Sequence, residues 1–283
     1  SYVVHELPQL LYTAMTRRKR VFELPDIDGV IAEGLPVKRD NDRKAWLPIM
    51  YGCNNFCTYC IVPYVRGRER SRQVDDIVKE FKELVSEGYK EITLLGQNVN
   101  SYGKDLTPSV SFSELLRTLN ALDGDFRIRF MTSHPKDCTK DLLETMAECD
   151  KVATHLHLPF QSGNNRVLQA MNCGYTREKY MELINYAREL MGDELSVTSD
   201  IIVGFPGETD EEFSDTLRLC EKVRFDAMFT FIYSKRVGTP AASMPDPYSR
   251  EEKQAHFDAL TETANRISGE KHREYEGRTV KVL

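Results

Sequence analysis

The strongest constraint on the fold of this 283-residue sequence is a repeated alternation of short apolar runs with amphipathic stretches. The apolar runs occupy residues 45–50, 91–95, 126–131, 155–160, 197–203 and 227–233. Their length suits strands, and the stretches between them place apolar residues at helical spacing, as with Ile77, Phe81 and Leu84 after the first run. Because consecutive strand–helix units favour parallel pairing with right-handed crossovers, the sequence predicts an α/β fold, a partial (βα)6 TIM-like barrel.

Several of the expected helices carry start or stop signals. Ser111, Thr209 and Ser249 are each followed three residues later by glutamate, which is the capping-box pattern. Thr139 precedes another apolar stripe, and Gly88 is placed to end the helix that follows the first apolar run. These signals predict where the helices that follow the apolar runs begin or end.

The two ends of the sequence fit the repeat less well. Residues 7–20 are predicted to form a short helix, and residues 25–44 form a polar connector that contains Pro and Gly. Residues 1–44 are therefore expected to be the tail of a preceding domain with its linker, and residues 45–275 the core domain. An alternating apolar pattern in residues 276–283 is expected to start a further domain.

Composition narrows the class of protein. No apolar run approaches the length needed to cross a bilayer, and residues 1–20 lack a signal-peptide pattern, so we expect no membrane contact and a cytoplasmic location. A net charge of −6 argues against a globally basic nucleic-acid binder but leaves local basic patches open. Seven cysteines are an odd number, and in this setting they favour metal or redox use over disulfides.

Three of these cysteines, Cys53, Cys57 and Cys60, form a C-x3-C-x2-C motif directly after the first expected strand. In parallel α/β folds, functional residues gather in such loops at the carboxyl ends of strands. Thiolates suit soft metals and iron–sulfur clusters, and three ligands leave one iron of a four-iron cluster open. Zinc would need a fourth ligand, for which His5 or His134 would have to fold in. A non-catalytic, zinc-stabilised RNA-binding module therefore remains the alternative.

The motif resembles that of the radical S-adenosylmethionine (SAM) enzymes, in which it follows the first strand of a partial (βα)6 barrel and an aromatic residue, here Tyr59, precedes the last cysteine. Residues 51–72 are more specific, because they resemble the radical SAM tRNA methylthiotransferases of the MiaB type. Later segments agree with the same family: residues 95–103, 132–135, 157–163 and 199–209.

The resemblance implies a 4Fe-4S cluster held by Cys53, Cys57 and Cys60, with S-adenosyl-L-methionine on the open iron. Reductive cleavage would give a 5′-deoxyadenosyl radical, and the family adds a methylthio group to adenine C2 of N6-isopentenyladenosine next to the tRNA anticodon. The cofactor carries the chemistry, so no side chain is assigned as a catalytic acid or base. A related methylthiotransferase that acts on another tRNA adenosine or on a ribosomal-protein aspartate is the alternative within the class.

The resemblance also assigns residues that contact the cofactor or the substrate. The expected cofactor contacts are Tyr59, Gly96, Gln97, Asn98, Ser133, Asp200, Ile202 and Gly204. The expected substrate contacts are Arg66, Arg68, Arg70, His157, Gln161 and Arg236. The alternating arginines continue to Arg72 and have Tyr64 beside them, which suits RNA phosphates and bases, although a solvated loop paired with acidic neighbours would look the same. His157 has a structural interpretation as well as a substrate-facing one.

Two positions depart from the family pattern, and the remaining thiols have an ordinary interpretation. Cys173 stands where the family commonly has arginine, and Val237 where proline is common. Cys138 simply precedes a helix start, while Cys149 and Cys220 are predicted to be small buried apolar residues.

The resemblance further implies segments and partners beyond the core. In the family, a second 4Fe-4S cluster is held by an N-terminal methylthiotransferase domain, and this sequence has no cysteine before Cys53. Residues 1–44 and 276–283 are therefore expected to adjoin that domain and a C-terminal TRAM domain, without which full activity is not expected. The expected partners are tRNA with N6-isopentenyladenosine and a one-electron donor such as flavodoxin or ferredoxin, and a monomer is expected.

Overall fold

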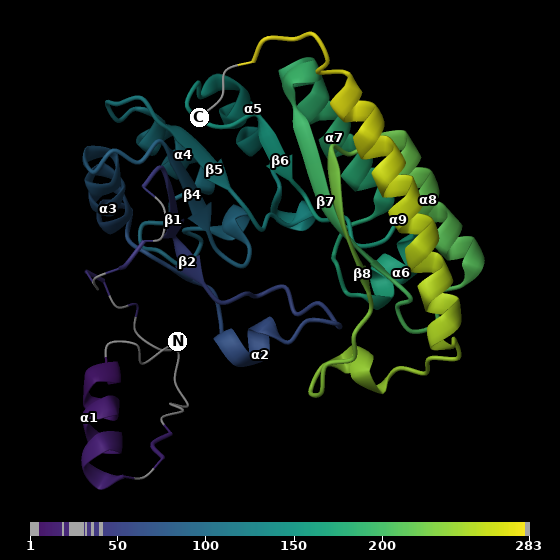
Figure 1. The fold of residues 1–283 in the computed structure, drawn as a ribbon, viewed down its shortest axis with the longest axis horizontal. Helices are drawn as coiled ribbons and strands as arrows, with labels where there is room; N and C mark the ends of the chain where they lie inside the picture. Colours follow the sequence, from purple (N-terminus) through teal and green to yellow (C-terminus); the bar gives the residue numbers. More distant parts are fainter. Residues whose placement is uncertain are drawn as a thin grey trace.

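Six parallel strands form two three-stranded sheets, each in chain order, that together curve into a partial barrel (Figure 1). The computed structural model describes residues 6–18, 20–22, 31, 33–34, 37–39 and 42–280. The strands are β1 (Lys44–Pro48), β4 (Glu91–Leu95), β5 (Arg127–Phe130), β6 (His155–His157), β7 (Ser196–Val203) and β8 (Ala227–Ile232). β1, β4 and β5 pair in one sheet and β6, β7 and β8 in another, and a parallel bridge between Ile128 and Val152 joins them. The predicted partial (βα)6 barrel is confirmed.

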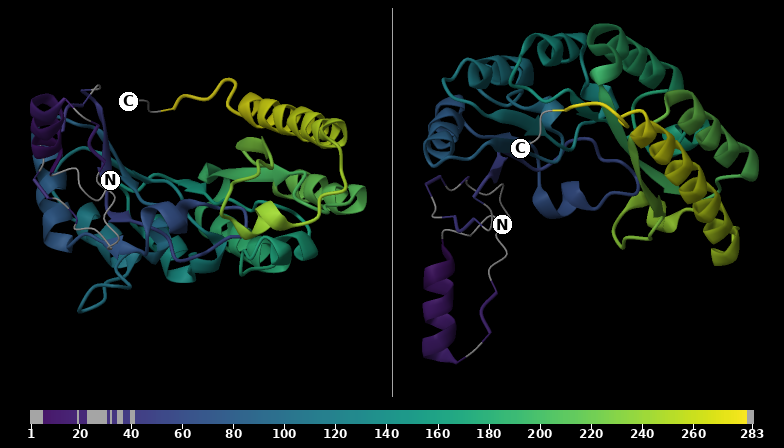
Figure 2. Two further views of the ribbon diagram at one scale, coloured as in Figure 1. Left: turned by 90° about the horizontal axis from the view of Figure 1, so that it is seen from below. Right: turned by 45° about the horizontal axis from the view of Figure 1, so that its top comes forward.

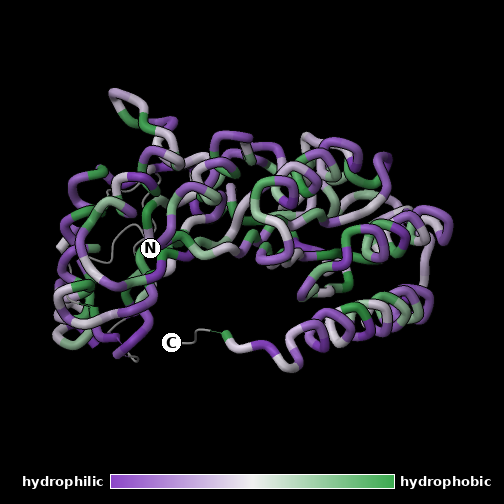
Figure 3. The backbone as a smooth tube through the Cα atoms, turned by 90° about the horizontal axis from the view of Figure 1, so that it is seen from above, coloured by the Kyte–Doolittle hydropathy of each residue, from purple (hydrophilic) through white to green (hydrophobic). Residues whose placement is uncertain are grey.

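Helices cover the outer face of the sheet (Figures 1 and 2). They are α3 (Val74–Ser86), α4 (Phe112–Asn120), α5 (Lys140–Glu148), α7 (Arg177–Met191), α8 (Asp210–Val223) and α9 (Arg250–Arg273). Strand residues alternate accordingly: in β1, Ala45 and Leu47 are buried while Trp46 points the other way. Along α9, hydrophobic and hydrophilic stretches alternate (Figure 3), and Leu260 and Ile267 are among its buried residues.

The expected helix starts are present. Ser111, Thr209 and Ser249 each form a capping box with the glutamate three residues on, and the Thr139 hydroxyl accepts from the Leu142 amide. Each cap satisfies a backbone N–H at the helix start that has no partner inside the helix.

Several strands are shorter than the apolar runs that predict them, and two of these differences lie next to the expected site. The run at 45–50 divides at Pro48, after which β2 (Met50–Tyr51) pairs antiparallel with β3 (Arg70–Ser71). The run at 155–160 forms strand only to His157, and the chain then turns at Gln161, which has a left-handed backbone with φ 63°. Pro48 itself does not end the pairing of β1 with β4, because the Ile49 amide still donates to the Leu95 carbonyl at 2.9 Å.

The sequence does not predict several short elements, because they are too brief to show a hydrophobic period. They are α2 (Val62–Arg66), α6 (Asn165–Ala170), and the 3-10 turns η2 (Val99–Ser101), η3 (Pro135–Asp137), η4 (Gly192–Glu194) and η5 (Pro240–Ser243).

Toward the ends of the chain the structure tests the expectations only in part. The predicted first helix is α1 (Leu7–Arg17), which ends before Arg18, and none of its residues is buried. Most of the expected connector 25–44 lies outside the described residues. So do residues 281–283, and residues 276–280 form no strand. No helix in the described ranges has the length and apolar character of a membrane span.

Candidate functional site

The three cysteines lie in one loop, residues 52–61, at the carboxyl end of the barrel, and we call this segment the cysteine loop. Hydrogen bonds fix it to both halves of the sheet. The Gly52 amide donates to Gln97 Oε1, just after β4, at 2.9 Å. The Thr58 amide donates to the Met171 carbonyl, which follows α6, at 2.9 Å. The loop therefore bridges the two halves at the end of the barrel where the sequence predicts a site.

Cys57 lies against a histidine that the sequence separates from it by 77 positions. Its Sγ is 3.9 Å from His134 Nε2. The Lys136 amide donates to His134 Nδ1 at 3.3 Å, so the ring proton belongs on Nε2, which faces the sulfur. His134 is thus placed to donate a hydrogen bond to a thiolate at Cys57.

The three thiols differ in their ease of ionisation. Burial raises the pKa of Cys53 to about 11 and also raises that of Cys60. At Cys57, a hydrogen bond from the Cys173 thiol lowers the pKa, burial opposes it, and His134 lowers it further. Ligand thiols must lose their protons to bind a metal, so metal binding here would release protons.

The loop after β4 and the segment after β5 supply buried polar atoms. Asn98 is fully buried, and its Nδ2 donates to Asp137 Oδ2 at 2.7 Å. Its Oδ1 and the Oγ of Ser133, also buried, have no hydrogen-bond partner among the described residues. At Gly96 a Cβ atom would lie 2.6 Å from Cγ of Met50. Buried polar atoms are nearly always paired, so the unpaired Asn98 Oδ1 and Ser133 Oγ are free to serve a ligand.

Residues predicted for different roles meet at the carboxyl ends of β6 and β7. His157 Nε2 lies 3.6 Å from Asp200 Oδ1, and His157 Nδ1 lies 2.9 Å from the Thr198 hydroxyl. The Gln161 backbone N–H donates to the Asp200 backbone carbonyl at 3.0 Å, and the Gln161 backbone carbonyl accepts from the Ile202 N–H at 2.9 Å. His157 is buried and hydrogen-bonded in this network, which agrees with its structural interpretation, whereas the Asp200 carboxylate is half-buried.

At the end of β7 the chain turns at Gly204, which has φ +66°. Its amide donates to Glu208 Oε2 at 2.6 Å, and Glu208 is buried. Burial raises the pKa of Glu208 to about 7, against the lowering effect of the Gly204 and Phe205 amides. Glu208 therefore holds the backbone of this turn by accepting a hydrogen bond from the Gly204 amide.

Tyr59 and Cys173 belong to one small apolar cluster beneath the cysteine loop. Tyr59 packs against a group of buried residues that includes Cys173, Met171 and Phe205. Burial raises the pKa of the Tyr59 phenol well above its ordinary value, so the ring stays neutral. Where the family commonly has arginine, this chain thus has a buried thiol next to a cysteine-loop residue.

The predicted substrate arginines lie on the surface beside the cysteine loop. Arg66, at the end of α2, and Arg68 are exposed, and the Arg68 guanidinium sits 4.7 Å from the Phe56 ring centroid. Arg70 lies in β3 and is half-buried. Arg236 is exposed in the segment after β8. All four border the same end of the barrel, with Arg70 the least accessible.

Arg72 corrects the sequence interpretation. It is 5% exposed, its Nε donates to Glu33 Oε1 at 2.7 Å, and its Nη1 donates to the Pro48 carbonyl at 2.7 Å. Its guanidinium is also ion-paired with Glu80. The inclusion of Arg72 among the RNA-contacting arginines is therefore wrong, because its charge is used inside the fold.

One surface residue of the site was missed. Phe229 of β8 pairs in register with Asp200 and its ring centroid lies 6.0 Å from that of His157, yet Phe229 is 50% exposed. The alternation of Phe229 and Phe231 within the sixth apolar run was the available signal, because alternate residues of a strand share a face. By contrast, the predicted burial of Cys149 and Cys220 is confirmed.

The chain is similar to known proteins over most of its length. The profile of the Radical SAM superfamily matches residues 47–220. The tRNA-2-methylthio-N(6)-dimethylallyladenosine synthase of Acetivibrio thermocellus is 55% identical over 283 residues, and that of Clostridium tetani is 54% identical over 279 residues. These alignments cover 100% and 99% of this chain but 59% and 61% of the relatives, so the chain spans less than two thirds of their length.

Solved structures agree on the fold. The radical S-adenosylmethionine methyltransferase TsrM from Kitasatospora setae matches with a TM-score of 0.60 at 17% identity, covering 76% of this chain and 42% of that one. Coproporphyrinogen III oxidase (HemN) from Escherichia coli matches with a TM-score of 0.57 at 18% identity, covering 80% and 52%. Because the superfamily profile covers more than half of the sequence and the barrel carries its cysteine loop at the expected end, this protein belongs to the radical SAM superfamily.

Proposed function

We propose that this chain is the radical-generating core of a tRNA methylthiotransferase that adds a methylthio group to adenine C2 of N6-isopentenyladenosine next to the anticodon. The observation that carries the proposal is the C-x3-C-x2-C loop held at the carboxyl end of a partial six-stranded barrel. The names of the two relatives, which align over nearly the whole chain, support the choice of reaction. Since the chain spans less than two thirds of those relatives, the reaction of the longer protein is part of the proposal.

The residues fit a 4Fe-4S cluster better than a zinc ion. Among the described residues, no three Cys, His, Asp or Glu side chains converge on a point suited to one metal ion. Structural zinc needs four ligands around one ion, whereas the cysteines of a four-iron cluster bind different irons and stand apart. Cys53, Cys57 and Cys60 would hold the cluster.

The polar atoms nearby fit S-adenosyl-L-methionine. The unpartnered Asn98 Oδ1 and Ser133 Oγ would bind its polar groups, and Asp200 and Ile202 would contact its adenosine. When bound, the two cofactors supply a one-electron reduction and a carbon-centred radical. The chain orients them, and the buried thiols and apolar cluster under the loop keep water away.

The substrate would approach across the arginines beside the cysteine loop. Arg66 and Arg68 would hold RNA phosphates, and the exposed Phe229 offers a ring on which a base can stack. A cavity of about 520 Å³ between Tyr64 and the segment that begins at Lys235 lies on the same side. We further propose a cytoplasmic monomer that takes electrons from a flavodoxin or ferredoxin.

The test is anaerobic reconstitution with iron and sulfide, followed by metal analysis and a search for 5′-deoxyadenosine after reduction with S-adenosyl-L-methionine present. About four irons per chain and cleavage of the cofactor are expected. Cys53→Ala, Cys57→Ala and Cys60→Ala should each abolish cleavage. Cys149→Ala is the matched control, because it removes a buried thiol far from the loop in sequence.

Two results would argue against the proposal. One zinc per chain without cleavage would leave a metal-stabilised RNA-binding module. Cleavage without any methylthio product on isopentenylated tRNA by the longer protein would keep the radical core and overturn the substrate.

A further inference from the structure

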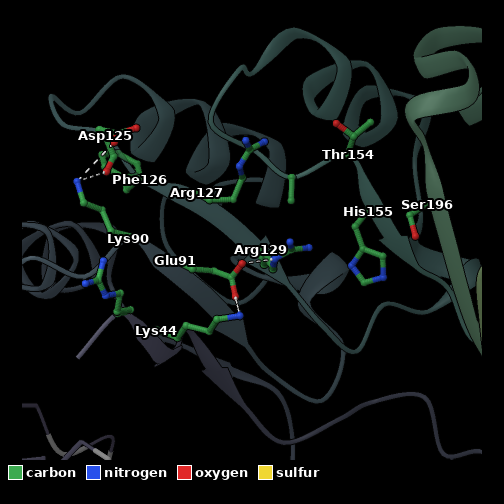
Figure 4. Close-up of a pocket in the computed structure, with 12 residues that line it drawn as sticks. Lys44, Lys90, Glu91, Asp125, Phe126, Arg127, Arg129, Thr154, His155 and Ser196 are labelled. Carbon is green, nitrogen blue, oxygen red and sulfur yellow. Dashed lines mark hydrogen bonds and ion pairs between the residues drawn. The ribbon is translucent and has the colours of Figure 1, made fainter. Parts of the chain in front are cut away.

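A second site candidate lies at the opposite end of the barrel from the cysteines. The amino ends of the strands enclose a cavity of about 830 Å³ (Figure 4). On one side it is lined by Arg127 and Arg129 of β5, and on the other by His155 of β6 and Ser196 of β7. The cavity thus spans the junction between the two sheets, where the Ile128–Val152 bridge connects them.

The charge of this cavity is strongly positive. Its cationic lining residues are Arg43, Lys44, Lys90, Arg127 and Arg129, and its acidic ones are Glu91 and Asp125. Glu91 is already held by Lys44 at 3.2 Å and by Arg129 at 2.6 Å. Asp125 faces Lys90 at 3.5 Å. Both acidic side chains of the lining are therefore ion-paired with lining residues other than Arg127.

Arg127 is the group that points to a ligand. It is half-buried at the start of β5, and its guanidinium forms no hydrogen bond or ion pair with any residue in the described ranges. Figure 4 places its side chain over the same space that Arg129 and His155 border. A planar guanidinium in a partly buried, positively charged cavity favours an oxyanion that it can bind in two-pronged fashion.

The opposite wall adds hydrogen-bonding groups without adding negative charge. Thr154 and Ser196 line it with hydroxyls. Burial, together with the charge of Arg129, lowers the pKa of His155 to about 4, so the ring is neutral at neutral pH. An anion with several oxygens would meet cations on one side and neutral polar groups on the other.

We infer that this amino-end cavity binds a small polyphosphate, either an inorganic oligophosphate or the phosphate chain of a nucleotide, across the junction of the two sheets. The volume lies within the usual range for small-ligand sites. Contacts to β5 on one side and to β6 and β7 on the other would make the ligand a clamp between the half-barrels, so its binding stabilises the folded chain. The inference is independent of the proposed reaction, because it concerns the other end of the barrel.

The experiment measures tripolyphosphate binding by isothermal titration calorimetry, with thermal unfolding as a second readout, at constant ionic strength. Saturable binding and a rise in Tm are expected for the unmodified chain. Arg127→Gln should weaken binding about tenfold, the loss of one charge-assisted two-pronged contact. The matched control is Arg218→Gln, which removes an exposed arginine from α8 and should leave binding unchanged.

Arg127→Lys guards against a folding defect, since it keeps the charge and should bind between the unmodified chain and Arg127→Gln. If tripolyphosphate had equal effects on the unmodified chain, Arg127→Lys and Arg127→Gln, the effect would be a general salt effect and would overturn the inference. Short single-stranded RNA provides the second arm. Arg127-dependent binding of RNA without binding of tripolyphosphate would assign the phosphates to a nucleic acid and would also overturn the small-ligand site.

Discussion

Arg72 and Glu33 form a two-pronged ion pair that ties the segment before the barrel to its first strands. Arg72 Nε lies 2.7 Å from Glu33 Oε1, and its Nη2 bonds the second carboxylate oxygen. Glu80 of α3 lies 2.9 Å from the same guanidinium. With Arg72 5% exposed, the arginine holds two carboxylates that would otherwise repel each other.

Arg72→Ala is therefore expected to lower the free energy of unfolding by about 2 kcal/mol, a figure below that for fully buried pairs because both carboxylates are partly exposed. Arg66→Ala, at an exposed position on the same stretch, should change it by less than about 0.5 kcal/mol. Urea unfolding followed by circular dichroism measures both. Equal destabilisation by the two variants would contradict the structural role of Arg72.

Arg66→Ala has its expected effect on RNA instead. Binding of the tRNA anticodon arm should weaken, and the slope of log K against log salt concentration should become shallower by about one, because one phosphate contact is lost. Fluorescence anisotropy over a range of salt concentrations gives the slope. Lys222→Ala, on α8, is the control for total charge. If Arg66→Ala and Lys222→Ala changed the slope equally, Arg66 would not contact RNA phosphates.

Gly52 fixes the start of the cysteine loop through its backbone. It has φ +75°, and a Cβ atom would lie 2.0 Å from the Arg68 carbonyl oxygen. Gly207 has nearly the same φ, +74°, with nothing within 4 Å of the added atom. Gly207→Ala should cost about 1 kcal/mol of strain, and Gly52→Ala at least twice that, because β2 and β3 must also separate. Thermal unfolding compares them, and equal costs would show that the close approach is relieved easily.

The sequence predicts those parts of the fold whose signals are local. The strand Glu91–Leu95 was predicted with its observed bounds, because five residues between a charged turn and Gly96 leave little choice. The capping boxes at Ser111, Thr209 and Ser249 were equally reliable, since both partners lie within four residues. The position of the cysteine loop followed from the first strand.

Contacts between distant segments could not be predicted in this way. The alternation that contains Arg72 looks the same whether its charge faces solvent or Glu33, which lies 39 positions earlier. The thiol of Cys173 meets Cys57 only because the segment after α6 folds under the cysteine loop. The amino-end cavity likewise gathers residues from five strands, no two of which form a motif.

Ser133 separates a ligand-binding role from a structural one. Its buried Oγ has no partner in the described part of the chain, so Ser133→Ala should leave stability unchanged or raise it by about 1 kcal/mol. If the hydroxyl binds the cofactor, the affinity of the reconstituted protein for S-adenosyl-L-methionine should fall about tenfold. Equilibrium dialysis and urea unfolding give the two values. A loss of stability with unchanged affinity would make Ser133 a structural residue.

Glu208 gives the chain a pH-dependent stability whose sign is fixed by its burial. Its pKa rises from 4.5 to about 7 on folding, so below pH 4.5 both states are protonated and no penalty exists. As the pH rises from 4.5 to 7, the unfolded chain loses this proton while the folded chain keeps it, and the free energy of unfolding falls, on the order of 3 kcal/mol in all. Glu208→Gln keeps an oxygen for the Gly204 amide and cannot ionise, so its stability relative to the unmodified chain should increase across this range. Urea midpoints between pH 4.5 and 8 measure the difference, with exposed Glu211→Gln as the control. A difference that stays constant with pH would mean that Glu208 is ionised in the folded protein throughout.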